Sequence, residues 1–460
     1  MRPSAAAPWL VPSAAASLVA LAVACSGNVS ELDTCAPNGR DVGGQCVCDS
    51  GFVAQEKACV PFTPIDGTDA GGGADAGGGE DGGTHDTDAG TGGEDAGTTD
   101  AGTTDAGMTD AGTPFDGGVP ADAGTPLNRA RVLFSGHSLS DNPLADHFHA
   151  IAQSRGKDNN WQQQIGIGSP LRMRTWGNGN WAGYSTGKNR SGQNMNILNE
   201  VANPQTIGAG ERYTHLVVTD RHDIPEVLRW ENTVGYLRHF HDRMASANSA
   251  AHTYFYHTWL ELNTSNPQPW IDYEKQAIGA WECAASKVNL TLEAASRPDR
   301  VTVLPGGLAL VHLVEAVMAN QVPGITGTTQ QKLARIFSDN VHLTNLGMYY
   351  MAAVQYAAVY RSSPVGAPTP SGLEAATVTD LQNRAWTFVT NYYAQPNAGT
   401  RTMADCRSLM QGVCQGFWTL RGNTGNIGSC QNTFSNATPS QTNRNPFVWP
   451  DPYFEPLPAP

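Results

Sequence analysis

This chain of 460 residues has no excess of basic residues. Asp and Glu number 42 against 28 Lys and Arg, which gives a formal net charge of −14 at pH 7. Residues 62–127 hold 14 of the acidic residues and no Lys or Arg, so 28 acidic and 28 basic residues remain elsewhere. Proteins that bind nucleic acid usually present clustered Lys and Arg. The sequence therefore predicts no nucleic-acid partner.

Motifs of metal and nucleotide chemistry are missing as well. The chain contains no H-E-x-x-H pair, no dense set of His and Asp ligands, and no phosphate-binding G-x-x-x-x-G-K-S/T loop. We therefore expect no metal site and no cofactor.

Residues 62–127 also lack enough apolar side chains to form a core. They consist almost entirely of Asp, Ala, Gly and Thr, as in "TDAGTTDAGMTDAG". Such a segment cannot offset the entropy lost on ordering, and its like charges repel one another. We expect a solvated linker with a mean reach of roughly 40–50 Å.

The N-terminus, residues 1–24, has the pattern of an export signal. Arg2 precedes the apolar stretch 10–24, which is too short to favour a membrane-spanning helix. The "AVAC" that follows resembles the lipobox of bacterial lipoproteins, although Ala22 stands where Leu is usual. That resemblance implies lipidation of Cys25 and an outer-membrane or cell-surface lipoprotein. The alternative is ordinary secretion after cleavage near Ala24, and both predict export, with a lipid anchor as the only membrane contact.

Export makes the remaining cysteines candidates for disulfides, because exported proteins meet an oxidising environment. The C-x-C and "DSGF" of residues 25–61 resemble half of an epidermal-growth-factor-like module. Metal binding is less favoured there, because the C-x-x-C pairs typical of zinc sites are missing. We expect the following cysteines to be disulfide-bonded, in pairs that spacing does not identify: Cys35, Cys46, Cys48, Cys59, Cys283, Cys406, Cys414 and Cys430.

Residues 128–400 alternate short β-like runs with helical patterns, which favours βαβ units and a parallel sheet. The expected strands are 131–136, 214–220, 252–259 and 301–306, with a fifth near 161–168. We predict a three-layer α/β/α sandwich with a flavodoxin-like central parallel sheet, whose ligands bind at the carboxyl ends of the strands. Residues 401–460 form a C-terminal extension that we expect to be held by disulfides rather than well packed.

Ser138 follows the first predicted strand, in "VLFSGHSLSDNPLADHF". A serine there presents its hydroxyl at the sheet edge, although small polar residues also cap helices at such turns. A catalytic serine needs a base. Asp339 and His342, three residues apart before an apolar helix that starts near Thr344, form a pair in which the carboxylate can orient the imidazole.

Together the blocks "GHSLSD" and "DNVHLTNLG" resemble those of the SGNH (GDSL-like) hydrolases, and the similarity covers most of 131–362. The resemblance implies that Ser138 is the nucleophile, His342 the general base and acid, and Asp339 its orienting partner. His137 stands where the family usually has Asp, which raises the question of what holds the nucleophile loop.

The same resemblance implies an oxyanion hole built from the Ser138 N–H, a glycine N–H and an asparagine side chain. Gly166 and Gly168 are the candidates for the glycine. In "VVTDRHD", His222 occupies the place of the asparagine. An imidazole can donate a hydrogen bond, but loss of one oxyanion donor typically costs about 10²–10³ in rate. The alternative is that residues 220–223 form an ion-pair loop on the surface.

Substrate contacts are predicted for His137, Trp176 and His257. The polar stretch 174–196, rich in Gly, Asn and Trp, resembles loops that stack sugar rings. The alternatives are a hydrogen-bonded core histidine at 257 and tryptophans that fill the core.

The function that these residues predict is an exported serine ester hydrolase that removes acetyl or other small acyl groups from carbohydrate or small esters. Lipase and arylesterase are alternatives within the same family. A third alternative is an inactive hydrolase fold that serves as a glycan-binding or adhesion module, which the substitutions at His137 and His222 favour.

Overall fold

The structure is a computed structural model that describes residues 39–42, 45–48, 52–55, 58–61, 125–177, 180–395, 398–437 and 445–448. The chain divides into two units, residues 1–107 and 108–460. The predicted signal peptide, Cys25 and most of the predicted linker lie outside the described residues.

The first unit contains two antiparallel hairpins. Strand β1 (Gly39–Val42) pairs with β2 (Gln45–Cys48), and β3 (Phe52–Gln55) pairs with β4 (Ala58–Pro61). The disulfides predicted for its four cysteines fall outside the described side chains and stay predictions.

The second unit is an α/β fold around a five-stranded parallel sheet. Its strands are β5 (Arg129–Gly136), β6 (Asp158–Ile165), β7 (His215–Val218), β8 (His252–Tyr256) and β9 (Val301–Leu304). They lie in the order β6-β5-β7-β8-β9 and all pair in parallel. The prediction of a central parallel sheet, with a strand near each of the five expected segments, is confirmed.

The helices of the described residues follow. They are α1 (Leu144–Ser154), α2 (Leu171–Thr175), α3 (Ile197–Ala202), α4 (Ile224–Trp230), α5 (Thr233–Ala247), α6 (Gln268–Ala294), α7 (Gly306–Met318), α8 (Thr329–Leu333), α9 (Asn345–Tyr360), α10 (Ala375–Tyr393), α11 (Met403–Leu420) and α12 (Ile427–Ser435). Three short 3₁₀ helices join them, η1 (Ser138–Ser140), η2 (Ala182–Ser185) and η3 (Thr424–Asn426).

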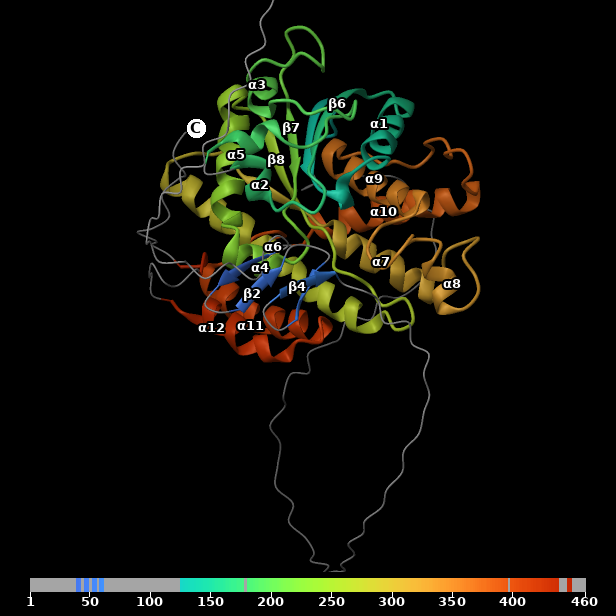
Figure 1. The fold of residues 1–460 in the computed structure, drawn as a ribbon. Helices are drawn as coiled ribbons and strands as arrows, with labels where there is room; N and C mark the ends of the chain where they lie inside the picture. The colour runs from blue at the N-terminus through green and yellow to red at the C-terminus, as the bar shows by residue number, and fades with distance from the viewer. Residues whose placement is uncertain are drawn as a thin grey trace, which may run out of the picture. The chain divides into compact units, whose positions relative to one another are not determined.

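Helices cover both faces of the sheet. Every residue of β5 after Arg129 is buried, and successive side chains of a strand point to opposite faces, so neither face of this strand meets solvent. In Figure 1, α1, α9 and α10 lie on one side of the strands, and α3 and α5 lie on the other. Helix α9 is buried along almost its whole length, because it packs between α1, α10 and β5.

The strand order has a reversal point beside β5, the position at which open parallel sheets commonly bind ligands. Numbered along the chain, the five strands run 2-1-3-4-5, an order in which the direction of winding reverses between the first and third strands. Loops that leave the carboxyl ends of strands at such a point diverge and leave a crevice. Here the reversal lies between β5 and β7, so the residues after Gly136 and after Val218 border it.

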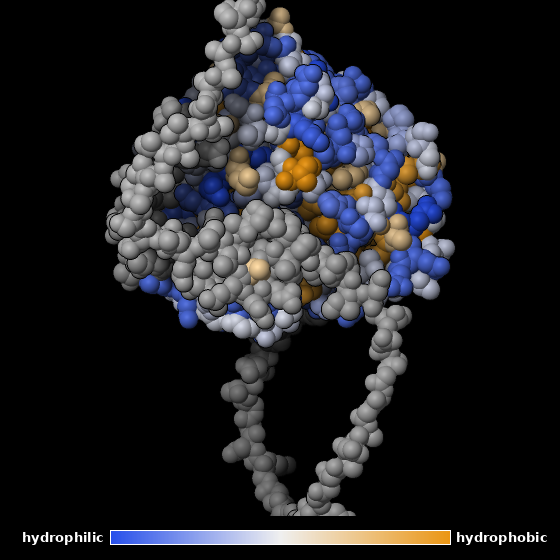
Figure 2. Space-filling model, viewed as in Figure 1, coloured by the Kyte–Doolittle hydropathy of each residue, from blue (hydrophilic) through white to orange (hydrophobic). Residues whose placement is uncertain are grey.

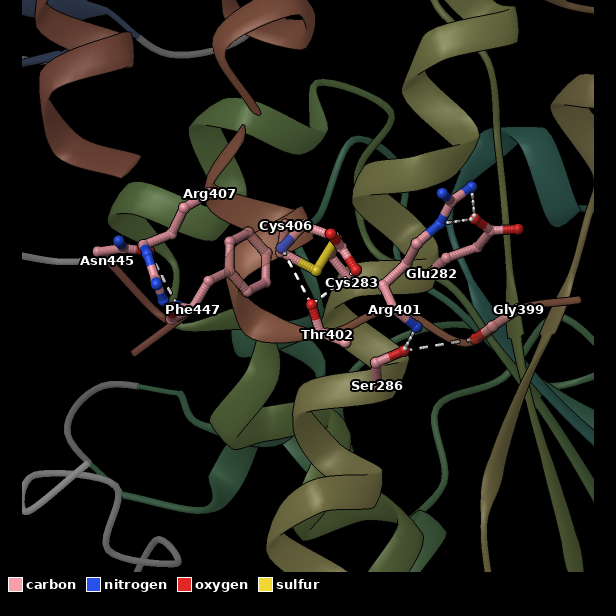
Figure 3. The surroundings of a disulfide bond; sticks show 11 residues. Glu282, Cys283, Ser286, Gly399, Arg401, Thr402, Cys406, Arg407, Asn445 and Phe447 are labelled. Atoms are coloured by element: carbon pink, nitrogen blue, oxygen red, sulfur yellow. Dashed lines mark hydrogen bonds and ion pairs between the residues drawn. A yellow bond between two sulfur atoms is a disulfide. The ribbon is translucent and has the colours of Figure 1, made fainter. Parts of the chain in front are cut away.

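A disulfide joins the C-terminal helices to the sheet-bound helix α6. Cys283 on α6 and Cys406 on α11 are bonded, with 5.6 Å between their Cα atoms, and Figure 3 shows the surroundings of this bond. Beside it, the Arg401 side chain binds Glu282 at 2.7–2.8 Å. A second disulfide joins Cys414 and Cys430. The prediction that these four cysteines form disulfides is confirmed.

The C-terminal helices are better packed than the sequence suggested. Met410, Val413 and Phe417 recur at helical spacing on α11, are buried, and belong to the hydrophobic cluster that also contains the sheet. The expectation of an extension held mainly by disulfides is therefore wrong, because the many polar residues of this segment lie on the outer faces of amphipathic helices.

The surface of the second unit is largely hydrophilic on the face shown in Figure 2, where hydrophobic residues form small separate groups. The large hydrophobic side chains that are most exposed among the described residues are Ile167, Met173 and Trp230. Two of these, Ile167 and Met173, follow strand β6 closely.

Candidate active site

Ser138 lies immediately beyond the carboxyl end of β5, as the first residue of η1. The turn is tight. A Cβ on Gly136 would lie 2.5 Å from the Ser140 Oγ and 3.1 Å from the Thr219 Cγ2, so only glycine fits there. The turn leaves Ser138 half-buried, next to the crevice between β5 and β7.

His342 and Asp339 reach this serine from a distant part of the chain. The Nε2 of His342 lies 3.1 Å from the Ser138 Oγ, and its Nδ1 lies 2.7 Å from the Oδ2 of Asp339. The Nδ1 proton therefore donates to the carboxylate, which leaves Nε2 to accept the serine proton. Folding thus brings together the three residues predicted to form the triad, although 204 positions separate Ser138 from His342.

Local hydrogen bonds keep the Asp339 carboxylate ionised. Its Oδ1 accepts from the backbone N–H groups of Val341 at 2.7 Å and His342 at 2.6 Å. Burial by itself raises the pKa of Asp339, but these N–H groups and the imidazole hold that pKa below its ordinary value. The side chains of Asp339 and His342 are 51 % and 42 % exposed, so solvent and substrate can reach them.

The segment after β8 supports the loop that carries the dyad. The Trp259 indole N–H donates to the Val341 carbonyl at 2.8 Å, and the Leu262 N–H donates to the Asn340 carbonyl at 2.7 Å. The sequence analysis did not single out Trp259. Its only signal was its position just past a strand that ends at the same edge of the sheet as Ser138.

His137 holds the nucleophile turn from the inside. It is 1 % exposed; its Nδ1 accepts from the Leu139 N–H at 3.4 Å, and its Nε2 donates to the Asp220 carbonyl at 3.1 Å. Burial and then the neighbouring charges of His222 and Arg174 hold the pKa of His137 well below its ordinary value, so the ring is neutral. Both ring nitrogens bind the backbone, and the predicted substrate contact of His137 is therefore corrected to a structural one.

The two candidate glycines of the oxyanion hole differ in what their N–H groups do. The Gly166 N–H donates to the Gly136 carbonyl at 2.9 Å, which ties β6 to β5 and uses this donor. Gly168 has φ +65°, a left-handed conformation that favours glycine. Among the described residues, no hydrogen bond uses the Gly168 N–H. Gly168 is therefore the better candidate of the two for an oxyanion donor.

Arg174 is a buried cation behind the nucleophile that the sequence analysis missed. Its guanidinium is fully buried and donates to the Ser135 Oγ at 3.2 Å, to the Ser169 carbonyl at 2.7 Å and to the Thr219 carbonyl. Burial lowers the pKa of Arg174 to about 10. The residue links the ends of β5 and β7 to the loop after β6, and therefore fixes the floor of the site.

The segment after β7 contains a buried carboxylate and a partly buried ion pair. Asp220 is fully buried and accepts from the Leu171 N–H at 2.8 Å and the Thr233 hydroxyl at 2.7 Å. Arg221 binds Asp223 through two hydrogen bonds of 2.6 and 2.9 Å. The ion pair of the alternative thus forms between Arg221 and Asp223, but it is partly buried rather than on the surface, and Asp220 is part of the core.

His222 faces the nucleophile turn and has a carboxylate partner of its own. Its Nε2 lies 3.3 Å from the Glu261 Oε1, and its ring centroid lies 6.0 Å from that of His137. Its Nδ1 is buried and has no hydrogen-bond partner among the described residues. A buried polar atom without a partner is costly, so a group that binds this nitrogen gains a hydrogen bond.

His257 does not reach the site. It is fully buried, its Nε2 lies 3.2 Å from the Glu274 Oε2, and its Nδ1 accepts from the Leu308 N–H at 3.3 Å. The predicted substrate contact at His257 is therefore wrong, because the chain after β8 turns inward and packs this side chain under α6 and α7.

Trp176 remains accessible. It is half-buried at the end of α2 and packs edge-on against Trp181 at 4.7 Å between ring centroids. Trp181 in turn stacks on His239 at 3.9 Å, and Trp161 and Trp259 are core residues. Trp181, like Trp176, is half-buried, whereas Trp230 is exposed.

The described residues contain no group of three or more His, Cys, Asp or Glu side chains that could hold a metal ion. None of the helices in this part of the chain is long and apolar enough to cross a membrane.

Comparison with known proteins leaves the family open. No protein-family model matches the chain, and no curated protein matches it. The crystal structure of a DUF4886 family protein from Bacteroides uniformis ATCC 8492 is similar with a TM-score of 0.41 and 13 % sequence identity, over 59 % of this chain and 98 % of that chain. A likeness this distant assigns neither family nor activity.

Proposed function

We propose that this protein is a serine ester hydrolase of the SGNH type, with the three-layer sandwich of that family as its second unit. The observation that carries the proposal is the relay from the Ser138 Oγ to His342 at 3.1 Å and from His342 to Asp339 at 2.7 Å. Such a relay lets an imidazole remove the serine proton while a carboxylate stabilises the imidazolium that forms.

The reaction proceeds in two halves. His342 Nε2 takes the Ser138 proton as the Oγ attacks the ester carbonyl, and the tetrahedral intermediate collapses when His342 donates that proton to the leaving alcohol. Water then gives a proton to His342 and attacks the acyl-enzyme, and return of the proton to Ser138 releases the carboxylic acid. The half-exposed dyad leaves room for both the alcohol and the water.

Three groups are proposed as oxyanion donors. As the first residue of η1, Ser138 has no acceptor for its N–H within that turn. The Gly168 N–H is the second donor. His222 is the third: Glu261 binds its Nε2, and its buried Nδ1 donates to the oxyanion when the ring carries both protons.

The surroundings of the serine favour a small acyl group on a polar substrate. Ile167, which lies between the two candidate glycines, is 60 % exposed and offers a short apolar contact. Beyond it, the stretch that holds Trp176 and Trp181 is polar and aromatic, which suits a carbohydrate. We therefore propose that acetyl or a similarly small acyl group is removed from carbohydrate.

A second candidate is a glycan-binding or adhesion module without turnover. The observation that favours it is the replacement of an amide oxyanion donor by His222, which is engaged with Glu261. The intact relay of Ser138, His342 and Asp339 favours the enzyme.

Export is part of the proposal, with a lipid on Cys25 or release after cleavage near Ala24 as the two forms. The disulfides Cys283–Cys406 and Cys414–Cys430 suit an oxidising compartment. If Cys25 is lipidated, the acidic stretch 62–127 serves as a tether for the hydrolase unit at the cell surface.

The test is hydrolysis of p-nitrophenyl acetate and p-nitrophenyl octanoate by the full mature chain. Ser138→Ala is expected to lower acetate turnover by several orders of magnitude with its fold intact. Ser140→Ala is the matched control, because its hydroxyl lies in the same turn and has no hydrogen-bond partner among the described residues. Preference for octanoate points to a lipase, and equal rates for wild type and Ser138→Ala overturn the enzyme in favour of the binding module.

A further inference from the structure

A cavity of about 480 Å³ lies at the opposite edge of the sheet from Ser138. It opens at the amino ends of β8 and β9, where His252 and Thr302 line it, whereas Ser138 lies past the carboxyl end of β5. The length of a five-residue strand, about 15 Å, separates the two edges. The cavity is therefore a different site from the proposed hydrolase site.

Arg361 supplies positive charge to this cavity. It is the residue that ends α9, it lines the cavity, and no ion pair is found for it among the described residues. Arg361 and His252 line the same cavity, and burial and then the charge of Arg361 lower the pKa of His252 to about 4. The cavity thus holds a cation that has no carboxylate partner in the described part of the chain.

His252 adds an unused hydrogen-bonding atom. Its Nε2 is buried and has no partner among the described residues. Leaving such an atom unpaired is costly, and a ligand oxygen at this position offsets that cost.

The remaining walls combine apolar and aromatic side chains with the polar side chains of Thr302, Thr390 and Gln395. The Tyr254 hydroxyl donates to the Ala358 carbonyl at 2.9 Å, and the Tyr393 hydroxyl donates to the Val303 carbonyl at 2.8 Å. Their polar ends are therefore occupied, and the rings serve as walls together with Ala357, Trp386 and Val389. One part of the cavity is cationic, and the rest suits a flat apolar group.

We propose that this cavity binds a small organic carboxylate with a planar apolar body, of the size of an aromatic acid. Arg361 binds the carboxylate through a charge-assisted hydrogen bond, and the Nε2–H of His252 donates to one of its oxygens. The ring of the ligand packs against the aromatic side chains of α10 and β8.

The test is isothermal titration of the full mature chain with benzoate and with benzamide, its neutral analogue of the same shape. We expect benzoate to bind with one site per chain and benzamide to bind at least about tenfold more weakly. Arg361→Gln is expected to weaken benzoate binding by a similar factor. Arg155→Gln is the matched control, because Arg155 also ends a helix, α1, but does not line the cavity.

A second variant distinguishes loss of binding from a change in folding caused by Arg361→Gln. Thr390→Phe fills the cavity without altering its charge, and we expect it to abolish benzoate binding with an unchanged melting temperature. Absence of benzoate binding to the wild type, or equal affinity in wild type and Thr390→Phe, overturns the proposal. Acetate-ester turnover is measured on the same variants and is expected to stay at the wild-type rate, so failure of one proposal leaves the other intact.

Discussion

Asp339 binds His342 through both of its carboxylate oxygens. Oδ1 accepts a hydrogen bond from the backbone N–H of His342 at 2.6 Å, and Oδ2 lies 2.7 Å from the imidazole Nδ1. The Asp339 side chain therefore stabilises the backbone of this loop and also orients the imidazole ring of His342. Because the two residues are three apart, this arrangement places Nε2 toward Ser138 with no further side chain needed to orient the ring.

Replacement of Asp339 by Asn tests this double role. An amide of the same size no longer stabilises the imidazolium and favours the wrong tautomer of His342, so kcat is expected to fall by about 10²–10⁴. Asp141→Asn is the control, since among the described residues the Asp141 side chain accepts only the neighbouring Asn142 N–H. In the double variant with Ser138→Ala, Asp339→Asn should cost nothing further, and an additive loss would contradict the shared mechanism.

His222→Ala tests the proposed third oxyanion donor. We expect kcat for p-nitrophenyl acetate to fall by about 10²–10³ and KM to change little, because an oxyanion donor acts mainly in the transition state. Glu261→Gln, which weakens the hold on Nε2 at 3.3 Å, is expected to give a smaller loss. An unchanged kcat in His222→Ala shows that the remaining donors suffice.

His137→Asp introduces the residue that SGNH hydrolases usually have at the matching position, and we expect it to destabilise this protein. A carboxylate cannot donate to the Asp220 carbonyl that His137 binds at 3.1 Å, and its charge would be buried, because position 137 is 1 % exposed. The expected loss is about 1–3 kcal/mol in the free energy of unfolding, measured by urea denaturation. His137→Asn keeps both a donor and an acceptor, so it should lose less; the reverse ranking would contradict this account.

The two disulfides should differ in their contribution to stability. Cys283–Cys406 closes a loop of 123 residues and Cys414–Cys430 a loop of 16. Loop-closure entropy gives about 5 kcal/mol for the longer loop and about 3 kcal/mol for the shorter. Paired Cys→Ser variants compared by denaturant unfolding should follow this order, and equal losses would show that packing of α11 on α6 replaces the bond.

Acid should weaken the segment after β7. Burial raises the pKa of Asp223, but Arg221 outweighs it and lowers that pKa to about 2. A carboxylate with a lowered folded-state pKa stabilises the fold above its unfolded pKa, near 4, and this contribution disappears as pH falls toward 2. It is worth about 2 kcal/mol.

Asp223→Asn is therefore expected to flatten the loss of stability between about pH 4 and pH 2, as followed by urea midpoints at each pH. Asp272→Asn, at an exposed carboxylate on α6, is the control. A pH profile that is the same in wild type and Asp223→Asn would show that the Arg221 pair does not contribute in this window.

Local patterns were sufficient to predict the framework of this protein. Alternating β-like and helical runs identified the five strands of the parallel sheet, and a serine after the first strand and a D-x-x-H block before an apolar helix identified the three residues of the relay. Each of these signals depends on neighbours within a few residues, through the alternation of strand faces or the hydrogen bonds of one loop. The carboxyl ends of parallel strands lie at one edge of the sheet, so the position of Ser138 at that edge was also predictable from the sequence.

The supports of the site were decided only by the tertiary structure. Nothing near Arg174 in the sequence indicates that it binds Thr219, and nothing near His257 shows that it turns toward Glu274 rather than toward Ser138. The same holds for the Trp259 bond to Val341 and for the partner of His222. Whether a polar side chain faces the crevice or the core depends on which distant groups fold against it, because a buried polar atom must find a partner wherever the chain supplies one.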